Sequence, residues 1–201
     1  MVGISGSSGV IYGVRLLEVL RDLKVKTYLV MSTAAKETLV METDRKVSEV
    51  EALASEVLGF NDIAASIASG SFLTDGMAVI PCSMKTLSGI ATGYSDNLLL
   101  RAADVTLKER RPLVVVPREA PLTTIHLENM LRVANAGGII VPATPAFYTR
   151  PKTIEDMVDH TVGKVLDIFK VSHKLYPGWN GPSPASGAKS RRLSRASSGR
   201  P

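Results

Sequence analysis

Short, mostly apolar runs alternate with longer amphipathic segments along most of this chain. The apolar runs are Met1–Ile4, Lys26–Met31, Met77–Pro81, Leu113–Pro117 and Gly138–Pro142. Two of them, Met77–Pro81 and Leu113–Pro117, carry no polar side chain, which is typical of strands buried on both faces. Strands that alternate with helices predict a parallel sheet covered by helices on both sides. The sequence therefore predicts a three-layer α/β fold in a single domain.

The segments between these runs have the apolar spacing of helices. In the first one, Val14, Leu17 and Leu20 recur at helical intervals, and charged residues occupy the other face. The last one starts with Thr153 as a capping residue and Asp156 three positions later. The predicted helices are Tyr12–Leu23, Ser32 or Thr33 to Met41, Ser48–Leu58, Ser83–Ala91, Asn97–Arg110, Ile125–Ala136 and Thr153–Phe169.

The charge is unevenly distributed along the 201 residues. The formal net charge is +5 and the sequence pI is near 9.4, values that by themselves suggest a nucleic-acid partner. Five basic residues and no acidic ones fall in residues 180–201, so residues 1–179 are neutral. That last segment is rich in Gly, Pro and Ser, and we expect it to be a disordered basic tail. Residues 1–179 form the predicted functional domain, with no basic groove for nucleic acid.

Several classes of protein are disfavoured by what the chain lacks. The single cysteine, Cys82, excludes an intrachain disulfide. No apolar run approaches the ~18 residues of a membrane span, and no signal-peptide pattern is present. His126, His160 and His173 have no metal-ligand spacing. We therefore expect a cytoplasmic protein with no metal and no membrane association.

The first strand is followed by a turn rich in glycine and serine. This turn, Gly3-Ile4-Ser5-Gly6-Ser7-Ser8-Gly9, opens a helix, and such a helix start favours bound phosphate. Its spacing differs from the dinucleotide G-x-G-x-x-G pattern. Ser32, not an acidic residue, follows the second strand, which favours a mononucleotide such as FMN over NAD. A tight turn without ligand is the plain structural alternative.

Polar residues also follow the later strands. Ser83-Met84-Lys85-Thr86 places hydroxyls and a cation after the third strand, although Ser83 is also an ordinary helix cap. Arg118 and Glu119 follow the fourth, where neighbouring cations suit Glu119 to acid/base chemistry. Pro142 and Pro145 stiffen the loop that presents Tyr148. All these turns lie at the carboxyl edge of the predicted sheet, where such folds bind ligands.

With these turns, the chain closely resembles the UbiX-type flavin prenyltransferases over residues 1–179. The segments that carry the resemblance are GISGSSGVIYGVRLL, LVMSTAAKETLVMET, ASIASGSFLTDGMAVIPCSMKTLSGIATG, RAADVTLKERRPLVVVPREAPL, IHLENML and PATPAFYTRP. The resemblance implies a Rossmann-like, flavodoxin-type fold that binds FMN and needs no metal. It implies transfer of the dimethylallyl group of dimethylallyl monophosphate to N5 and C6 of reduced FMN. The product, prenylated FMN, serves UbiD-type decarboxylases, and family members usually form dodecamers with active sites between subunits.

The resemblance also implies roles for single residues. Those expected to bind FMN are Gly6, Ser7, Ser8, Ser32, Ser83, Met84, Lys85, Thr86 and Arg118. Those expected to hold the prenyl phosphate are Tyr148, Lys164, Lys108, Arg101, Glu42 and Trp179. Those expected to act in catalysis are Glu119, Ser8, Lys108 and Tyr148, with Glu119 as the acid/base residue. Preorganised cations suit the charge that develops on a leaving phosphate.

The chain departs from the family pattern at two places. Lys164 stands where many members have Arg, which keeps the charge but loses the bidentate fork. The first strand is short before Gly3.

The alternatives to a flavin prenyltransferase are a non-catalytic FMN-binding accessory protein of a decarboxylase, a flavin-dependent decarboxylase, and, more weakly, an NAD dehydrogenase. The phosphate-site residues Lys108, Glu119 and Tyr148 argue against simple FMN storage.

Overall fold

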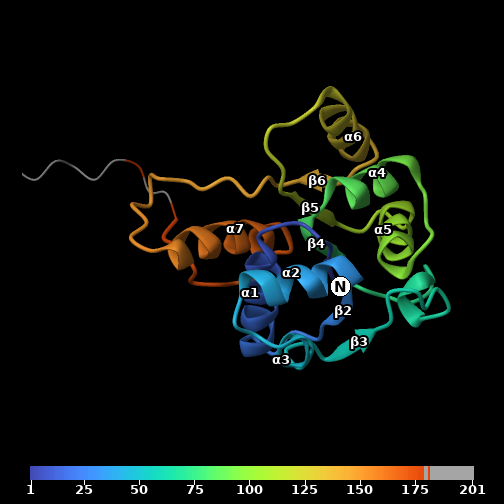
Figure 1. Cartoon of the computed structure of the whole chain (residues 1–201), viewed down its shortest axis with the longest axis horizontal. Coiled ribbons are helices and arrows are strands. Elements are labelled where there is room, and N and C mark those ends of the chain that lie inside the picture. The colour runs from blue at the N-terminus through green and yellow to red at the C-terminus, as the bar shows by residue number, and fades with distance from the viewer. Residues whose placement is uncertain (179–180, 182–201) are drawn as a thin grey trace, which may run out of the picture.

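Six parallel strands form one sheet in the computed structural model of the chain, which describes residues 1–178 and residue 181 (Figure 1). The strands are β1 (Val2–Ile4), β2 (Tyr28–Met31), β3 (Glu56–Leu58), β4 (Met77–Cys82), β5 (Leu113–Pro117) and β6 (Ile139–Ile140). Their order is β3-β2-β1-β4-β5-β6. After β1, the strands β2 and β3 are added on one side of it, and β4, β5 and β6 are then added on its other side. The direction of the strand order therefore reverses between β1 and β4, which flank the switch point of the sheet.

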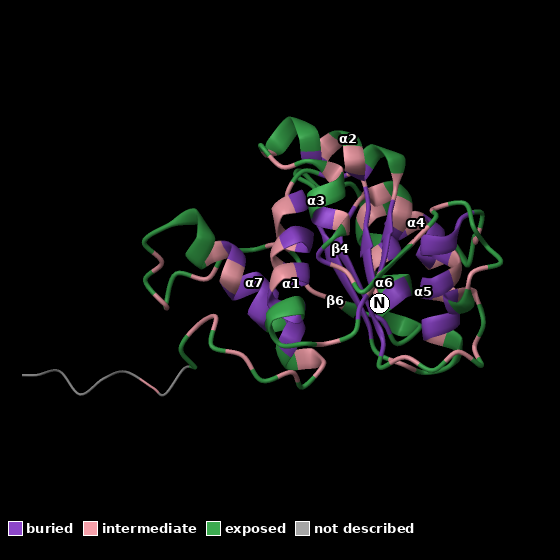
Figure 2. Cartoon of the chain, turned by 90° about the horizontal axis from the view of Figure 1, so that it is seen from below, coloured by how far each residue is buried: buried purple, intermediate pink, exposed green. Residues whose placement is uncertain are grey.

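Helices cover both faces of this sheet. They are α1 (Val10–Asp22), α2 (Thr33–Glu42), α3 (Val47–Glu51), α4 (Met84–Thr92), α5 (Leu98–Lys108), α6 (Thr124–Asn135) and α7 (Ile154–Ile168), with a 3₁₀ turn at Ser66–Ala68. Figure 2 shows the buried strands between two groups of helices. The three-layer, Rossmann-like α/β fold expected from the sequence is confirmed.

Alternate residues of the central strands divide the core in two. Val114 and Val116 of β5 belong to the cluster that packs against α1 and α7. Leu113 and Val115 belong to the cluster formed with α4 and α5. Because successive strand residues point to opposite faces, a strand covered on both sides has to be apolar throughout, and all five residues of β5 are buried.

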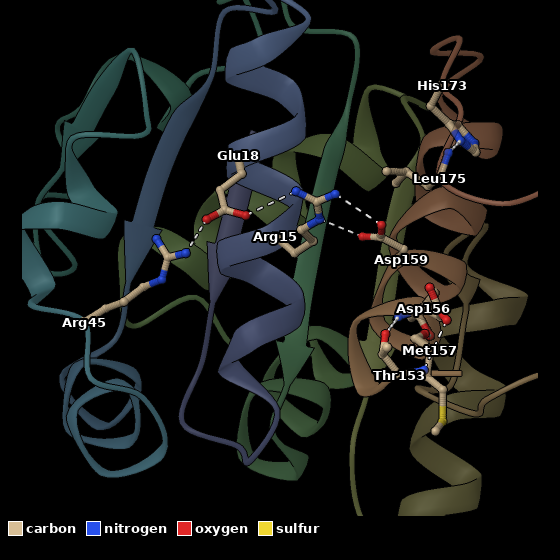
Figure 3. A network of polar contacts seen from close by, with 10 residues as sticks. Arg15, Glu18, Arg45, Thr153, Asp156, Met157, Asp159, His173 and Leu175 are labelled. Carbon is tan, nitrogen blue, oxygen red and sulfur yellow. Dashed lines mark hydrogen bonds and ion pairs between the residues drawn. The ribbon is translucent and has the colours of Figure 1, made fainter. Parts of the chain in front are cut away.

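An ion-pair network fastens α1 to α7 beside the core (Figure 3). Arg15 on α1 donates from Nε to Asp159 Oδ1 at 2.6 Å and from Nη2 to Oδ2 at 3.1 Å. Glu18 accepts from Arg15 at 3.4 Å and from Arg45 at 2.5 Å. The two-pronged contact between Arg15 and Asp159 fixes the orientation of α7 relative to α1.

The predicted helix Ser48–Leu58 is wrong in its second half. The helix there, α3, ends at Glu51, and Glu56–Leu58 form the edge strand β3 beside β2. The side chains of Thr27 and Ser55 each accept the other's backbone N–H at 3.1 Å, which holds the chain against β2 and directs it into a strand. The short, exposed β3 has no apolar pattern of its own. The last predicted strand, Gly138–Pro142, is also shorter, because only Ile139–Ile140 pair.

Over residues 1–178 and 181, none of the helices combines the length and the apolar character of a membrane span. The predicted basic tail, residues 180–201, lies outside the described residues apart from residue 181.

Candidate active site

Ser5 joins the turns that follow the two central strands. This buried residue follows β1, and its Oγ accepts the N–H of Ser83 at 2.8 Å and donates to the Pro81 carbonyl at 3.2 Å. Its own N–H also donates to Pro81. The turns after β1 and β4 are therefore one rigid unit at the switch point. This role of Ser5 was not predicted from the sequence, in which Ser5 is one residue of the turn rich in glycine and serine. The signal for its role was its place as the first hydroxyl after the first strand.

The turn after β2 meets the same unit. Ser32 donates its N–H to the Ile4 carbonyl at 3.0 Å, and its Oγ caps α2 by accepting the N–H of Ala35 at 3.1 Å. Gly6 lies against the start of α2, so closely that a Cβ at Gly6 would be 2.3 Å from the Cβ of Ala34. Only glycine permits this approach.

These three turns line one cleft of about 630 Å³ at the carboxyl edge of the sheet. Five residues predicted to bind FMN border it, namely Gly6, Ser32, Ser83, Lys85 and Thr86. Ser83 Oγ caps α4 by accepting the N–H of Thr86 at 3.3 Å and lies 3.1 Å from Thr86 Oγ1. Phe60 and Tyr94 also line the cleft. Hydroxyls, a cation and aromatic rings suit the phosphate, ribityl and ring parts of a flavin mononucleotide.

Met84 follows Ser83 and packs against the core on the α4 side of the sheet. Cys82, one residue before Ser83, is fully buried, and burial raises the pKa of its thiol far above the usual range. Since the thiolate is the nucleophilic form, the structure gives Cys82 a packing role.

Ser7, Ser8 and Arg118 form a second cluster beside this cleft. Arg118 Nε donates to the carbonyl of Ser8 at 3.1 Å, and Ser7 Oγ donates to the carbonyl of Arg118 at 2.9 Å. The end of β5 is thereby fastened to the turn after β1. Glu119 comes next and is exposed, and its carboxylate accepts the N–H of Ala120 at 3.1 Å.

Glu42, the last residue of α2, contacts the start of α1. Its Oε2 accepts the N–H of Gly9 at 2.8 Å and that of Val10 at 3.2 Å. The sequence predicted that these helix N–H groups would face a phosphate. In the structure a carboxylate of the chain occupies that position, so Glu42, which was expected beside the prenyl phosphate, lies at the first turn.

Tyr148 and Lys164 lie outside the lining of this cleft, on the loop after β6 and on α7. Tyr148 has its hydroxyl 3.3 Å from His160 Nε2. Lys164 Nζ lies 3.5 Å from Asp167 Oδ2. Both side chains are about half exposed, which leaves them accessible to a small anionic ligand.

Arg101 and Lys108 are not brought to these residues within one chain. Arg101 pairs with Asp104 at 2.6 Å and donates to the Ala68 carbonyl at 3.2 Å. Lys108 pairs with Glu109 at the end of α5, near the amino edge of β5. Lys108 is therefore at the edge of the sheet opposite Glu119. Trp179, the remaining predicted residue, lies outside the described residues.

A doubly wound parallel sheet with hydroxyl-bearing turns gathered at its switch point defines the nucleotide-binding α/β class, here with a flavin-sized cleft. The family model described as Flavoprotein matches residues 1–176. The chain is 55% identical over 184 residues to the flavin prenyltransferase UbiX of Escherichia coli K12, covering 90% of this chain and 97% of the relative. It belongs to the flavoprotein family, in the group of UbiX-type flavin prenyltransferases.

Solved structures agree with this assignment. A structure of AnUbiX (PadA1) in complex with FMN and dimethylallyl pyrophosphate has a TM-score of 0.89 and 50% identity, and covers 90% of this chain and 97% of its own. A dodecameric FMN-dependent UbiX-like decarboxylase from Escherichia coli O157:H7 has a TM-score of 0.88 and 54% identity, with coverages of 90% and 98%. The family resemblance predicted from the sequence is confirmed.

Proposed function

We propose that this chain transfers the dimethylallyl group of a dimethylallyl phosphate to N5 and C6 of reduced FMN, and so makes prenylated FMN. The observation that carries the proposal is the convergence of the predicted turns on one cleft at the switch point. Its relative AnUbiX binds both FMN and a dimethylallyl phosphate ester. UbiD-type decarboxylases are the proposed recipients of the product.

The residues around the cleft fit FMN. Ser32, Ser83 and Thr86 offer hydroxyls, and Lys85 offers a cation for the phosphate. The absence of a side chain at Gly6 keeps the first turn against α2 and the cleft open. When bound, reduced FMN supplies the electron-rich N5 and C6 positions that accept the allylic group. The residues of the chain hold and orient it.

The allylic phosphate is assigned to Tyr148 and Lys164. Breaking the allylic C–O bond places negative charge on the departing phosphate, and a preorganised hydroxyl and ammonium group stabilise that charge. Lys164 offers a point charge, whereas an Arg at this position would offer a bidentate fork. Closing the new ring also requires proton movement, which we assign to Glu119, with Ser8 and Glu42 beside it.

We assign Arg101 and Lys108 to a neighbouring copy of the chain. In one copy they lie away from Glu119, so their predicted role requires a site shared between subunits. The exposed apolar residues Ile125, Leu127 and Leu131 of α6 offer a surface for such assembly. The Escherichia coli O157:H7 relative is dodecameric, and we propose a homo-oligomer of this kind in the cytoplasm.

The test combines the purified chain with FMN, a reductant and dimethylallyl monophosphate under anaerobic conditions. Mass spectrometry should then show a flavin heavier by one dimethylallyl unit. A parallel reaction with the diphosphate identifies the donor. FMN that remains unmodified with both donors, in folded and FMN-loaded protein, would leave only a flavin-binding role. Activation of an apo UbiD-type decarboxylase by the product tests the recipient.

The domain boundary is tested in the same assay. We propose that residues 1–179 are sufficient for the reaction and that the basic tail is dispensable. A chain that ends after residue 179 should make prenylated FMN at the rate of the full chain. A lower rate would assign a function to the tail.

A further inference from the structure

His160 contacts Tyr148 and has no role in the proposed function so far. It belongs to α7, and the residue is only 7% exposed. Its Nε2 lies 3.3 Å from the Tyr148 hydroxyl, and the two rings meet edge to face at 84° with centroids 5.8 Å apart. A buried side chain in hydrogen-bond contact with a proposed substrate-binding hydroxyl has the geometry to orient it.

A second layer of contacts fixes His160 itself. The Tyr176 ring lies 4.8 Å from the His160 ring, and the Tyr176 hydroxyl donates to Asp167. Asp167 also contacts His173 Nε2 at 3.1 Å and Lys164 Nζ at 3.5 Å. The His160 ring thus contacts Tyr148 and Tyr176, and Tyr176 is in turn bound to Asp167.

A glycine makes this arrangement possible. A Cβ at Gly163 would lie 2.4 Å from Tyr176 Cε1 and 2.8 Å from His173 Cε1. The missing side chain therefore lets the segment after α7 pack directly on the helix. That segment brings the Tyr176 ring against the His160 ring.

The protonation of His160 determines the direction of its hydrogen bond. Burial, together with the charge of Lys164, lowers the pKa of His160, so the ring is neutral near pH 7. Its Nδ1 is buried without a hydrogen-bond partner among the described residues. A neutral imidazole carries one N–H, and burying an unpaired N–H is disfavoured more than burying an unpaired acceptor. The proton therefore belongs on Nε2, the nitrogen that faces Tyr148.

We propose that His160 is a positioning residue, which donates from Nε2 to the Tyr148 oxygen and so directs the Tyr148 proton toward the phosphate of the allylic substrate. A tyrosine hydroxyl donates one proton and can also accept a hydrogen bond. When the Tyr148 oxygen accepts a hydrogen bond from His160, its own proton is available to a different acceptor. Accepting a hydrogen bond also strengthens the hydroxyl as a donor. The inference rests on the proposed function, because it names how one of its phosphate-binding residues is oriented.

A double-variant cycle tests the coupling between the two residues. His160→Phe keeps an aromatic ring for packing on Tyr176 but removes the donor. Its KM for dimethylallyl monophosphate should rise roughly three- to tenfold, with FMN affinity unchanged. In a Tyr148→Phe background the same substitution should add nothing. A full additional increase there would show that His160 acts independently of Tyr148 and would overturn the proposal.

Two further variants separate positioning from packing. His160→Gln retains an N–H donor, and recovery of most of the lost affinity is expected if donation matters. His173→Phe is the matched control, because it changes another histidine that contacts Tyr176. Its effect should be additive with Tyr148→Phe. Coupling of His173 equal to that of His160 would reduce both to general packing and contradict the proposal.

Nitrogen-15 solid-state spectroscopy of histidine-labelled protein gives a readout without turnover. The chain has three histidines, and His160→Gln identifies the His160 signals. The expected result is a neutral ring with the proton on Nε2. A proton on Nδ1 would overturn the proposal, whereas failure of the unmodified chain to prenylate FMN would count against the proposed function alone.

Discussion

The carboxylate of Glu42, at the end of α2, accepts hydrogen bonds from the backbone N–H groups of Gly9 and Val10 at the start of α1. The first N–H groups of a helix have no partner inside it, and they form the positive end of the helix dipole. Glu42 therefore neutralises the first turn of α1 and ties α2 to it. The same contact places Glu42, a residue expected to hold the prenyl phosphate, against Gly9, the neighbour of Ser8.

Removal of this contact should destabilise the fold. We expect Glu42→Ala to lower the free energy of unfolding by about 1 kcal/mol, and Glu42→Gln by less because an amide oxygen still accepts. Thermal denaturation of FMN-free protein measures the change. Glu37→Ala, an exposed position on the same helix, is the control. Equal losses for Glu37→Ala and Glu42→Ala would contradict a specific capping role.

The contact between Gly6 and Ala34 predicts a substitution and its rescue. Gly6→Ala would place its Cβ 2.3 Å from the Cβ of Ala34, so the turn must move and FMN affinity should fall more than tenfold. Ala34→Gly removes that atom, and the double variant should recover part of the affinity. Flavin-fluorescence titration measures it.

The single variant Ala34→Gly is the control for this pair, because glycine inside a helix costs up to about 1 kcal/mol by itself. No recovery in the double variant would show that the Ala34 backbone, 3.1 Å from the same position, determines the spacing.

Much of the fold was predictable because its signals are local. Leu113–Pro117 reads as a buried strand from five residues, and Thr153 with Asp156 forms the expected capping box at the start of α7. The edge strand β3 was not predictable, because its pairing depends on Thr27 and Ser55, which are far apart in the sequence. An exposed strand also lacks the apolar pattern that identifies a buried one.

The site shows the same division between local and distant information. Ser32 and Ser83 were predictable because parallel strands bring their carboxyl ends to one edge. The role of Ser5 as the link between two turns depends on atomic geometry. The contact of Glu42 with Gly9 joins residues 33 positions apart. The proposed role of Lys108 at the phosphate involves a second copy of the chain, which no local pattern specifies.

Arg118 offers a test of how the first turn is held. Its Nε bond to Ser8 and the Ser7 bond to its carbonyl fasten β5 to this turn. Arg118→Ala should weaken FMN binding about tenfold, which corresponds to ~1.4 kcal/mol. Arg118→Lys should recover part of the loss because a cation remains.

Isothermal titration of FMN measures both Arg118 variants. Arg21→Ala, at the far end of α1, serves as the matched control and should bind FMN like the unmodified chain. Unchanged binding in Arg118→Ala would remove Arg118 from the predicted flavin site.

The pKa of His160 should respond in opposite directions to its two charged neighbours. Burial lowers it first, Lys164 lowers it further, and Asp167 raises it. Lys164→Met should therefore bring the pKa of His160 closer to the ordinary value near 6.5, and Asp167→Asn should lower it further. Nitrogen-15 chemical shifts followed across pH measure both changes.

The lowered pKa of His160 also predicts how the free energy of unfolding depends on pH. Because the folded pKa lies below the unfolded value near 6.5, the unfolded chain binds the extra proton first as pH falls. The contribution of neutral His160 is complete above about pH 6.5 and is lost as pH falls toward the folded pKa. The difference in melting temperature between the unmodified chain and His160→Phe should accordingly shrink across this range. A difference that stays constant with pH would show that the folded and unfolded pKa values of His160 are equal.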